Sequence, residues 1–345
     1  MTKLIRVLSI DGGGIRGVIP GQVLVYLERQ LQIKSGNANA RIADYFDFFA
    51  GTSTGGILTC ALLTPDAPGS TKAKYTATQV LGFYKDRGND VFDEDLFGGL
   101  LRPKYKAEGI EKVLKDYFGN DELKNLIKPC LITSYDIERR RAHFFTNLDA
   151  KIDDECNFKV IDATRSTSAA PTYFPPAQIE SLSGKEFALV DGGVFVNNPT
   201  LCAYSEIRQH VKSFADSEKN ATAKEMLIVS IGTGVSEAPY MYDEAKKWGL
   251  TGWVQPIIDI MMSGASETTD YHLEQMYDAI EKPEQYIRLN IEIPKEVSTD
   301  MDDASPENIK SLMLLGEKLV EEQKRVLDRL VEKLIENDTN ENPAV

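Results

Sequence analysis

The chain reads Gly51-Thr52-Ser53-Thr54-Gly55-Gly56 between an apolar run at residues 46–50 and an apolar, helix-like stretch at residues 57–63. A serine between two glycines at a strand-to-helix turn is typical of a nucleophile elbow, because the glycines leave room for a sharp bend that exposes the hydroxyl. The pattern is short and also fits an ordinary turn without chemistry. Ser53 is therefore a candidate nucleophile whose assignment depends on the rest of the chain.

A glycine-rich loop lies near the start of the chain, at residues 11–17. It follows the apolar, β-branched run 4–10 and precedes an amphipathic helix that we predict from Val18 to Ile33, with Pro20 in its first turn. Consecutive glycine N–H groups at the start of a helix can converge on a negatively charged oxygen. The loop therefore predicts an anion site.

The same loop also fits the G-x-G-x-x-G fingerprint of dinucleotide-binding proteins, through Gly12, Gly14 and Gly17. That fingerprint needs an acidic residue at the end of a second strand about twenty residues further on, whereas Glu28 falls inside the predicted helix. The second strand delivers Ser53 instead, and no Gly-x4-Gly-Lys-Ser/Thr phosphate loop occurs. The residues favour an oxyanion site, with a Rossmann-type dinucleotide-binding protein as the alternative.

A third element ends in Asp191, after the apolar strand predicted at residues 187–190 and before two glycines. An aspartate followed by glycine is a common turn. A carboxylate beside a serine can also accept the hydroxyl proton, and general-base help of this kind raises rates by about 10²–10⁴. Such a base works best when burial raises its pKa toward the working pH. We expect Asp191 to be this base.

Four blocks of sequence, at residues 11–17, 51–56, 168–176 and 191–199, together resemble the patatin-like phospholipase family. The resemblance covers about residues 4–235. It implies a three-layer α/β/α fold with a mainly parallel central sheet, and a dyad in which Ser53 is acylated and Asp191 is its base. It also implies an oxyanion hole at Gly12, Gly13 and Gly14, a supporting role for Arg16 and Gly17, and elbow glycines at Gly51 and Gly55.

The resemblance implies a lipid acyl hydrolase of the phospholipase A type, which cleaves carboxylic esters of membrane phospholipids through an acyl-enzyme and needs no cofactor. The acidic residues Asp300, Asp302 and Asp303 lack the spacing of an EF-hand loop, so we predict no metal there. Some bacterial members of the family stay inactive until a cyclic nucleotide binds. No residue pattern identifies such a site here, and activation by a cyclic nucleotide is an alternative on the same chemistry.

Only three histidines could complete a Ser-Asp-His triad. Chain order would require one after Asp191: His210, in a helix predicted at residues 201–214, or His272, in a polar stretch after residue 264. His143 lies earlier, on a predicted strand. No histidine has a supporting motif, so the dyad is favoured over the triad.

Length and composition fit an enzyme with one main structural unit. The chain has 345 residues, 42% of them hydrophobic, and no internal repeat or low-complexity linker. We predict a catalytic core over residues 1–235 and a mostly helical extension over 236–345 that packs on it. An amphipathic helix is predicted from the N-cap Ser305 to about Ile335, and its apolar face packs on the core or on a second copy of the chain. The cysteines are widely spaced and indicate reduced packing residues.

The net charge of −14 argues against nucleic acid and against a purely electrostatic contact with anionic lipid. Any membrane contact should be apolar, and the best candidate is residues 248–262, which would otherwise form a core or interdomain helix. Residues 92–105 could form a lid. The arginines at 139–141 fit the charged tip of a hairpin. No signal peptide or membrane span is evident, so we expect a cytoplasmic protein.

Overall fold

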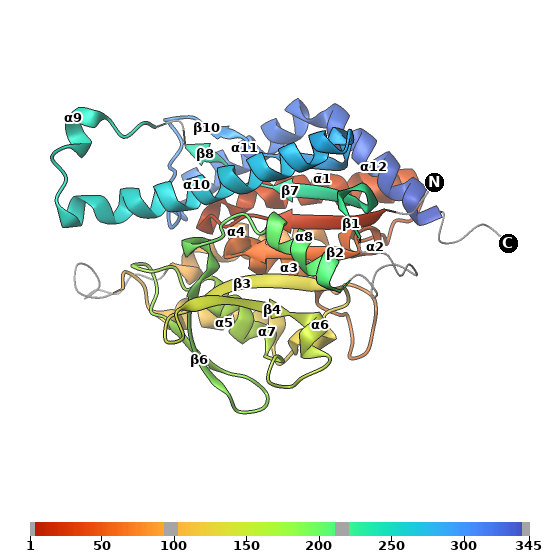
Figure 1. Cartoon of the computed structure of the whole chain (residues 1–345), viewed down its shortest axis with the longest axis horizontal. Helices are drawn as coiled ribbons and strands as arrows, with labels where there is room; N and C mark the ends of the chain where they lie inside the picture. Colours follow the sequence, from red (N-terminus) through yellow and green to blue (C-terminus); the bar gives the residue numbers. More distant parts are fainter. Residues whose placement is uncertain (1–3, 93–102, 211–220, 237, 340–345) are drawn as a thin grey trace.

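The computed structural model describes residues 4–92, 103–210, 221–236 and 238–339 (Figure 1). Its centre is a sheet in the order β5 (Ala177–Glu180), β6 (Glu186–Asp191), β3 (Cys130–Asp136), β2 (Phe48–Thr52), β1 (Ile5–Ile10), β7 (Met226–Ile231) and β9 (Tyr286–Leu289), with β4 (Arg141–Thr146) also paired to β3. The strands from β3 to β9 in this order are parallel, while β4 and β6 run antiparallel to β3. The predicted mainly parallel sheet is confirmed.

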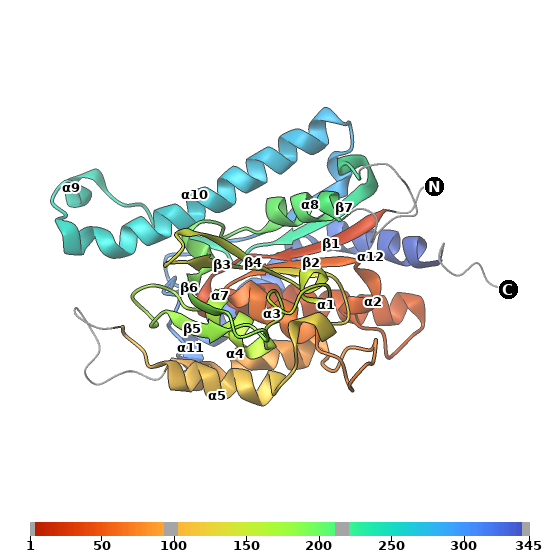
Figure 2. The same cartoon turned by 60° about the horizontal axis from the view of Figure 1, so that its bottom comes forward.

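Helices cover both faces of the sheet, as Figure 2 shows. Alternate residues of β1 serve two separate cores: Leu8 and Ile10 face one, and Ile5 and Val7 face the other. The first core contains α1 (Val18–Ser35), α3 (Thr54–Leu63), α4 (Ala77–Val91), α5 (Ala107–Phe118), α7 (Val160–Thr167), α11 (Pro306–Glu322) and α12 (Lys324–Thr339). The second contains α8 (Thr200–Gln209) and the rear half of α10 (Leu250–Ala279). This is the three-layer α/β/α fold.

Short elements complete the structure. They are the helices α2 (Ile42–Tyr45), α6 (Asn147–Ala150) and α9 (Tyr242–Ala245), the 3-10 turns η1 (Gly14–Gly17), η2 (Leu123–Asn125), η3 (Gly192–Val194), η5 (Ala223–Glu225) and η6 (Pro283–Gln285), and the pair of strands β8 (Val235–Ser236) and β10 (Glu292–Ile293). The chain beyond residue 235 also supplies β9, which pairs in parallel with β7 at the edge of the main sheet.

The C-terminal helix differs from its prediction. Ser305 is the N-cap as expected, and its hydroxyl accepts the N–H of Asn308, but the single helix to about Ile335 is wrong, because the chain turns at Gln323 and forms α11 and α12. The apolar positions explain the break. In a straight helix the stripe through Leu312 and Leu319 would continue to residues 323 and 326, whereas the residues buried in α12 begin at Leu327. The turn at Gln323 changes the direction of the chain, so that α11 and α12 both pack on α1.

Two other predicted elements are confirmed, and one predicted helix ends earlier than expected. The helix from Val18 and the hairpin whose tip carries the arginines 139–141 are confirmed. The predicted helix 201–214 ends at Gln209, and residues 211–220 lie outside the described part of the chain. Most of the candidate lid, residues 93–102, also lies outside it. The polar stretch after residue 264 that contains His272 belongs to α10. In the described ranges, no helix combines the length and apolar character needed to cross a bilayer.

Candidate active site

The serine elbow forms where β2 meets α3. Ser53 has φ 54° and ψ −122°, a conformation that L-residues rarely adopt, and it is 7% exposed. Its N–H donates to Thr167 Oγ1 at 2.8 Å, which anchors the turn to the end of α7. The elbow glycines permit close packing, because a Cβ at Gly55 would overlap the carbonyl of Ile10 and a Cβ at Gly51 would overlap the carbonyl of Gly55.

Sheet topology brings Asp191 to the same place. β3 extends beyond its last pairing with β2, at Thr133 opposite Thr52, and β6 pairs antiparallel with this extension so that Asp191 lies opposite Ser134. The last residue of β6 therefore reaches the level at which β2 ends. The Thr133 and Thr52 hydroxyls, 2.7 Å apart, join the two strands beneath the site.

Ser53 and Asp191 form a buried hydrogen-bonded pair. Ser53 Oγ donates to Asp191 Oδ2 at 2.6 Å, and the N–H of Gly193 donates to Asp191 Oδ1 at 2.7 Å. Burial raises the pKa of Asp191 to about 7, although both hydrogen bonds oppose the shift. The carboxyl group can thus exchange a proton near neutral pH while it contacts the serine hydroxyl.

The glycine-rich loop follows β1 and packs beside the elbow. The N–H of Gly12 donates to the carbonyl of Asn197 at 3.0 Å, so this amide, which we predicted as an oxyanion donor, is already occupied. Within the described residues, the N–H groups of Gly13 and Gly14 have no assigned acceptor. Of the three predicted donors, these two remain free to bind an anion.

Contacts on the carbonyl side hold the loop in place. Thr233 Oγ1 donates to the carbonyl of Gly12 at 2.6 Å, and Arg16 Nε donates to the carbonyl of Gly13 at 3.3 Å. Gly17 lies so close to the elbow that a Cβ there would overlap Thr54 Oγ1. Arg16 thus contacts the backbone of the loop, and Gly17 packs against the elbow.

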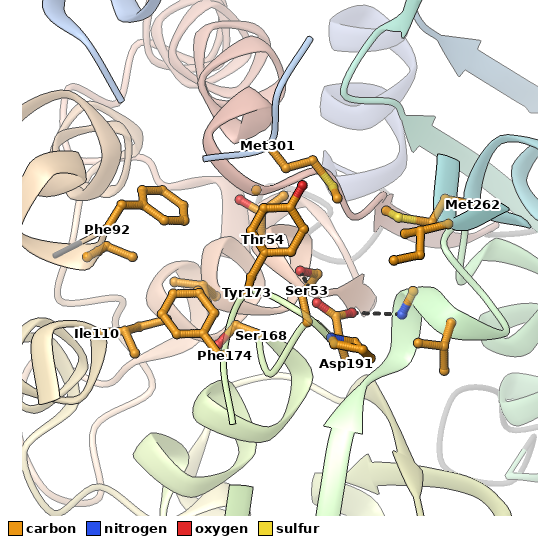
Figure 3. A pocket seen from close by; sticks show the side chains of 18 of the residues that line it. Ser53, Thr54, Phe92, Ile110, Ser168, Tyr173, Phe174, Asp191, Met262 and Met301 are labelled. Carbon is orange, nitrogen blue, oxygen red and sulfur yellow. Dashed lines mark hydrogen bonds between the residues drawn. The ribbon is translucent and has the colours of Figure 1, made fainter. Parts of the chain in front are cut away.

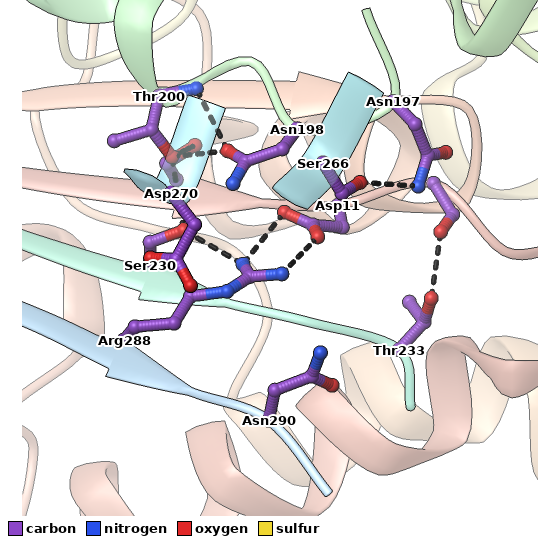
Figure 4. A network of polar contacts seen from close by, with 12 residues as sticks. Asp11, Asn197, Asn198, Thr200, Ser230, Thr233, Ser266, Asp270, Arg288 and Asn290 are labelled. Atoms are coloured by element: carbon purple, nitrogen blue, oxygen red, sulfur yellow. Dashed lines mark hydrogen bonds and ion pairs between the residues drawn. The ribbon is translucent and has the colours of Figure 1, made fainter. Parts of the chain in front are cut away.

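An ion pair fixes the residue that precedes the glycines. Asp11 accepts two hydrogen bonds from Arg288 on β9, at 2.6 and 3.0 Å, and Arg288 also donates to Ser230 Oγ at 2.8 Å (Figure 4). Asn197 donates from its side chain to Ser266 on α10 at 3.1 Å. The loop is thus tied to β7, β9 and α10 as well as to β1.

An apolar pocket opens over the serine (Figure 3). Its walls come from α3, α4, α5, α10 and the segment around residues 168–174, and Asp191 is the only charged residue among the described ones that line it. Its aromatic and aliphatic lining includes Phe83, Phe92, Ile110, Tyr173, Phe174 and Met262. Such a pocket can hold a hydrocarbon chain beside the Ser53 hydroxyl.

A family model described as patatin-like phospholipase matches residues 8–204, more than half of the chain. The chain belongs to the patatin-like phospholipase family. Three plant relatives align over most of it. They are "Patatin group D-2" of Solanum tuberosum (36% identical over 93% of this chain and 84% of that protein), "Probable inactive patatin-3-Kuras 1" of Solanum tuberosum (35%, 92% and 87%) and "Patatin-like protein 4" of Arabidopsis thaliana (33%, 92% and 84%).

Among solved structures, VipD from Legionella pneumophila aligns over 93% of this chain and 67% of that chain, at 11% identity and a TM-score of 0.34. This likeness is too weak to carry an argument. The patatin-like family is one of hydrolases that act on lipid esters. Because one relative is named as probably inactive, the case for activity depends on the residues of the site itself.

The histidines of this patatin-like protein lie away from the dyad. None lines the described pocket. His143 packs among Phe145, Phe158 and Phe187, where burial lowers its pKa to about 4. His210 contacts Glu206 at the end of α8, and His272 lies beside Tyr271 on α10.

Several residues of the site were not found from the sequence. Arg288 sits in a short strand with no motif. Thr167 contacts Ser53 and Thr233 contacts Gly12, but each pair is far apart in the sequence, so no local pattern indicates the contact. Asn197 lies in the block at residues 191–199, but nothing in the pattern identified its carbonyl as the partner of Gly12. Asp302 accepts hydrogen bonds from Lys104 and Tyr105, and the described residues contain no group of three or more side chains suited to a metal ion.

Proposed function

We propose that this protein hydrolyses carboxylic esters of phospholipids or related acyl lipids through a Ser53–Asp191 dyad and an acyl-enzyme. The observation that carries the proposal is the 2.6 Å contact between Ser53 Oγ and Asp191 Oδ2, made by a buried carboxyl group whose pKa is about 7. A serine hydroxyl needs a positioned base to become a nucleophile. Asp191 is such a base.

The reaction has two halves. Ser53 Oγ attacks the ester carbonyl carbon while its proton passes to Asp191, and the oxyanion accepts hydrogen bonds from the N–H groups of Gly13 and Gly14. When the intermediate collapses, the C–O bond to the alcohol breaks and Asp191 returns the proton to the leaving oxygen. Water then attacks the acyl-enzyme and loses a proton to Asp191. When the bond between the acyl carbon and Ser53 Oγ breaks, Asp191 returns this proton to Ser53 Oγ and the fatty acid leaves.

The pocket supports an acyl chain as the bound part of the substrate. Its lining is apolar except near the dyad, and no lysine or arginine belongs to it within the described part of the chain. A hydrocarbon chain gains by leaving water there, whereas a phosphate group would find no cationic partner. We therefore place the acyl chain in the pocket and the headgroup outside it.

The experiment that tests this proposal is covalent labelling with a fluorophosphonate, followed by peptide mass spectrometry. A fluorophosphonate reacts with an activated serine, so the adduct should appear on the peptide that contains Ser53. Ser53→Ala should abolish both the adduct and ester hydrolysis while the variant stays folded. An adduct on another residue, or esterase activity that survives Ser53→Ala, would contradict the assignment.

Two alternatives can be tested with the same preparation. If a cyclic nucleotide controls activity, hydrolysis should start only after one of a panel of cyclic dinucleotides is added, and full activity without ligand would exclude it. If the glycine-rich loop binds a dinucleotide, purified protein should carry nicotinamide absorbance. The buried hydrogen bond between Ser53 and Asp191 beside the loop, which a dinucleotide site would not need, favours the hydrolase.

A further inference from the structure

The front half of α10 and the segment before it expose an unusual amount of apolar surface. Nine of the eighteen large hydrophobic side chains that are exposed in the described structure lie between residues 240 and 261. In both overall views α9 and the beginning of α10 extend beyond the body of the molecule (Figures 1 and 2). Residues 248–262 were expected either to contact a membrane or to form a core or interdomain helix. Five of their large hydrophobic side chains from Trp253 to Met261 are at least 40% exposed, so a fully buried core helix is wrong for this segment.

These side chains share one face of the helix. Leu250, Trp253, Val254, Ile257 and Met261 follow the i, i+3, i+4, i+7 and i+11 spacing of a single stripe, and they are between 40% and 93% exposed. The opposite face holds α10 against the protein. It carries the residues that contact the body further along the helix: Ser266, Leu273 and Tyr277.

The outward face changes character along the same helix. After residue 264 its exposed positions become mainly polar, with Glu267, Thr268, His272, Gln275 and Asp278, and Tyr271 is the one large hydrophobic side chain exposed there among the described residues. A helix that faces water shows polar residues on its outer side, as the rear half of α10 does. The apolar front half lacks this pattern, which indicates that it faces something other than water.

The apolar stripe is continuous with the pocket. Ile258, Met261 and Met262 line the pocket from α10, and Gln255 donates to the hydroxyl of Tyr173, another lining residue, at 3.0 Å. Adjacent turns of one helix thus form a wall of the pocket and an exposed apolar stripe. Whatever the stripe contacts lies at the entrance to Ser53.

The charges of the segment and of the whole chain indicate which kind of apolar partner the stripe contacts. Between residues 248 and 264 the only charged side chain is Asp259, whose carboxylate accepts a hydrogen bond from Tyr240 at 2.7 Å. The chain carries a net charge of −14, which disfavours anionic lipid. Trp248 and Trp253, with rings 5.1 Å apart, are of the residue type enriched at lipid–water boundaries.

We propose that residues 248–262 form a docking surface for a zwitterionic or uncharged lipid surface. The outward stripe of α10 enters the lipid up to about residue 262, the polar stripe beyond stays in water, and the pocket entrance then faces the lipid. This proposal rests on the proposed function, because a lipid substrate explains why the stripe and the pocket share one helix.

Intrinsic fluorescence tests the surface directly, since Trp248 and Trp253 are the only tryptophans in the chain. Full-length Ser53→Ala protein, which leaves vesicles intact, is mixed with phosphatidylcholine vesicles. The emission should shift to the blue, and lipids brominated on the acyl chains should quench it. Emission that stays unchanged at saturating lipid would overturn the proposal.

A matched pair of variants separates the surface from the rest of the helix. Val254→Asp with Ile257→Asp places two carboxylates in the apolar stripe, and should weaken partition into vesicles by at least about tenfold. Thr268→Asp with Tyr271→Asp makes the same change fourteen residues later, on the exposed polar part of α10, and should leave partition within about twofold. Equal losses in both variants would overturn the proposal.

Two further readouts separate lipid docking from loss of the active site and from self-association. Both variants should hydrolyse a short-chain, water-soluble ester at the wild-type rate in an active Ser53 background, because neither pair lines the pocket. If sedimentation shows a dimer that only the Val254/Ile257 variant disrupts, and vesicles bind neither form, the stripe is an interface between copies and the lipid proposal is wrong. Vesicle docking without fluorophosphonate labelling would remove the proposed function but keep the surface.

Discussion

Asp11 and Arg288 join the loop after β1 to the edge strand β9 beside the active site. The two residues are 277 positions apart, yet their side chains form two hydrogen bonds, at 2.6 and 3.0 Å, immediately before the glycine-rich loop. The Asp11 side chain is 3% exposed and that of Arg288 is 12% exposed. The position of the proposed oxyanion donors therefore depends on the last strand of the sheet.

Arg288→Gln should lower kcat for a soluble ester by at least about tenfold while KM changes little. The reason is that loss of one correctly placed oxyanion donor costs about 10²–10³ in rate, and a displaced loop should cost part of that. Binding of a trifluoromethyl ketone, which needs the oxyanion hole, should weaken in parallel.

The control for this prediction lies at the other end of β1. Arg6 and Asp47 form a similarly buried pair there, at 2.7 Å and remote from Ser53. Breaking either pair should destabilise the fold by about 3–5 kcal/mol. Only Arg288→Gln should alter kcat in the protein that remains folded, and an equal loss in Arg6→Gln would show that the effect is a general one on stability.

The rate of hydrolysis should depend on the protonation of Asp191. A base must be deprotonated, and the pKa of Asp191 is raised to about 7 by burial. We expect kcat/KM to rise tenfold per pH unit below pH 7 and to level off above it. A profile that is flat between pH 5 and pH 8 would place the essential base elsewhere.

The ionisation of Asp191 should make the folded protein less stable as the pH rises. Its folded pKa of about 7 exceeds the ordinary value of 3.8, so the folded state holds the proton between these values while the unfolded state has lost it. Stability falls with rising pH across this window. Asp191→Asn cannot titrate, so at pH 8 it should be more stable than the wild type by up to roughly 4 kcal/mol. Urea unfolding at pH 4 and pH 8 measures this, and a difference independent of pH would contradict it.

The sequence was sufficient to predict the elements whose chemistry is local. The glycine spacing around Ser53 and the strand ending in Asp191 predicted where two turns form, and the family resemblance predicted that they meet. Contacts between distant segments carry no local signal. Thus Gly12 was predicted as a free donor although Asn197 takes its N–H, and Arg288 gave no indication of its ion pair with Asp11.

The prediction of helix ends and of exposed helix faces was limited by a different cause. The apolar stripe after Ser305 suggested one helix, because a change of phase near Gln323 is small compared with the scatter of apolar positions. Residues 248–262 were equally compatible with a core helix and with a surface, since hydrophobic content alone does not report what covers it. Only the packing of the rear half of α10 on the protein decided which face of the front half is exposed.

The strained elbow gives a test that does not involve activity. Ser53 holds a positive φ of 54°, which costs a residue with a side chain about 1–3 kcal/mol and costs glycine little. Ser53→Gly should therefore be more stable than Ser53→Ala by about 1 kcal/mol, although both lack the hydroxyl and the bond to Asp191. Equal stability by denaturant titration would mean that the elbow is relaxed.

The central claim is that Asp191 alone accepts the serine proton, and it is tested most directly by the turnover of a soluble ester in single and double variants. Asp191→Asn should be about as inactive as Ser53→Ala, and the double variant should be no worse, because the two residues act as a unit. His143→Gln, His210→Gln and His272→Gln should each lose less than about 10²-fold, the minimum expected for removing a general base. If a folded His210→Gln or His272→Gln is instead as inactive as Ser53→Ala, a histidine is the proton acceptor and the dyad mechanism is wrong.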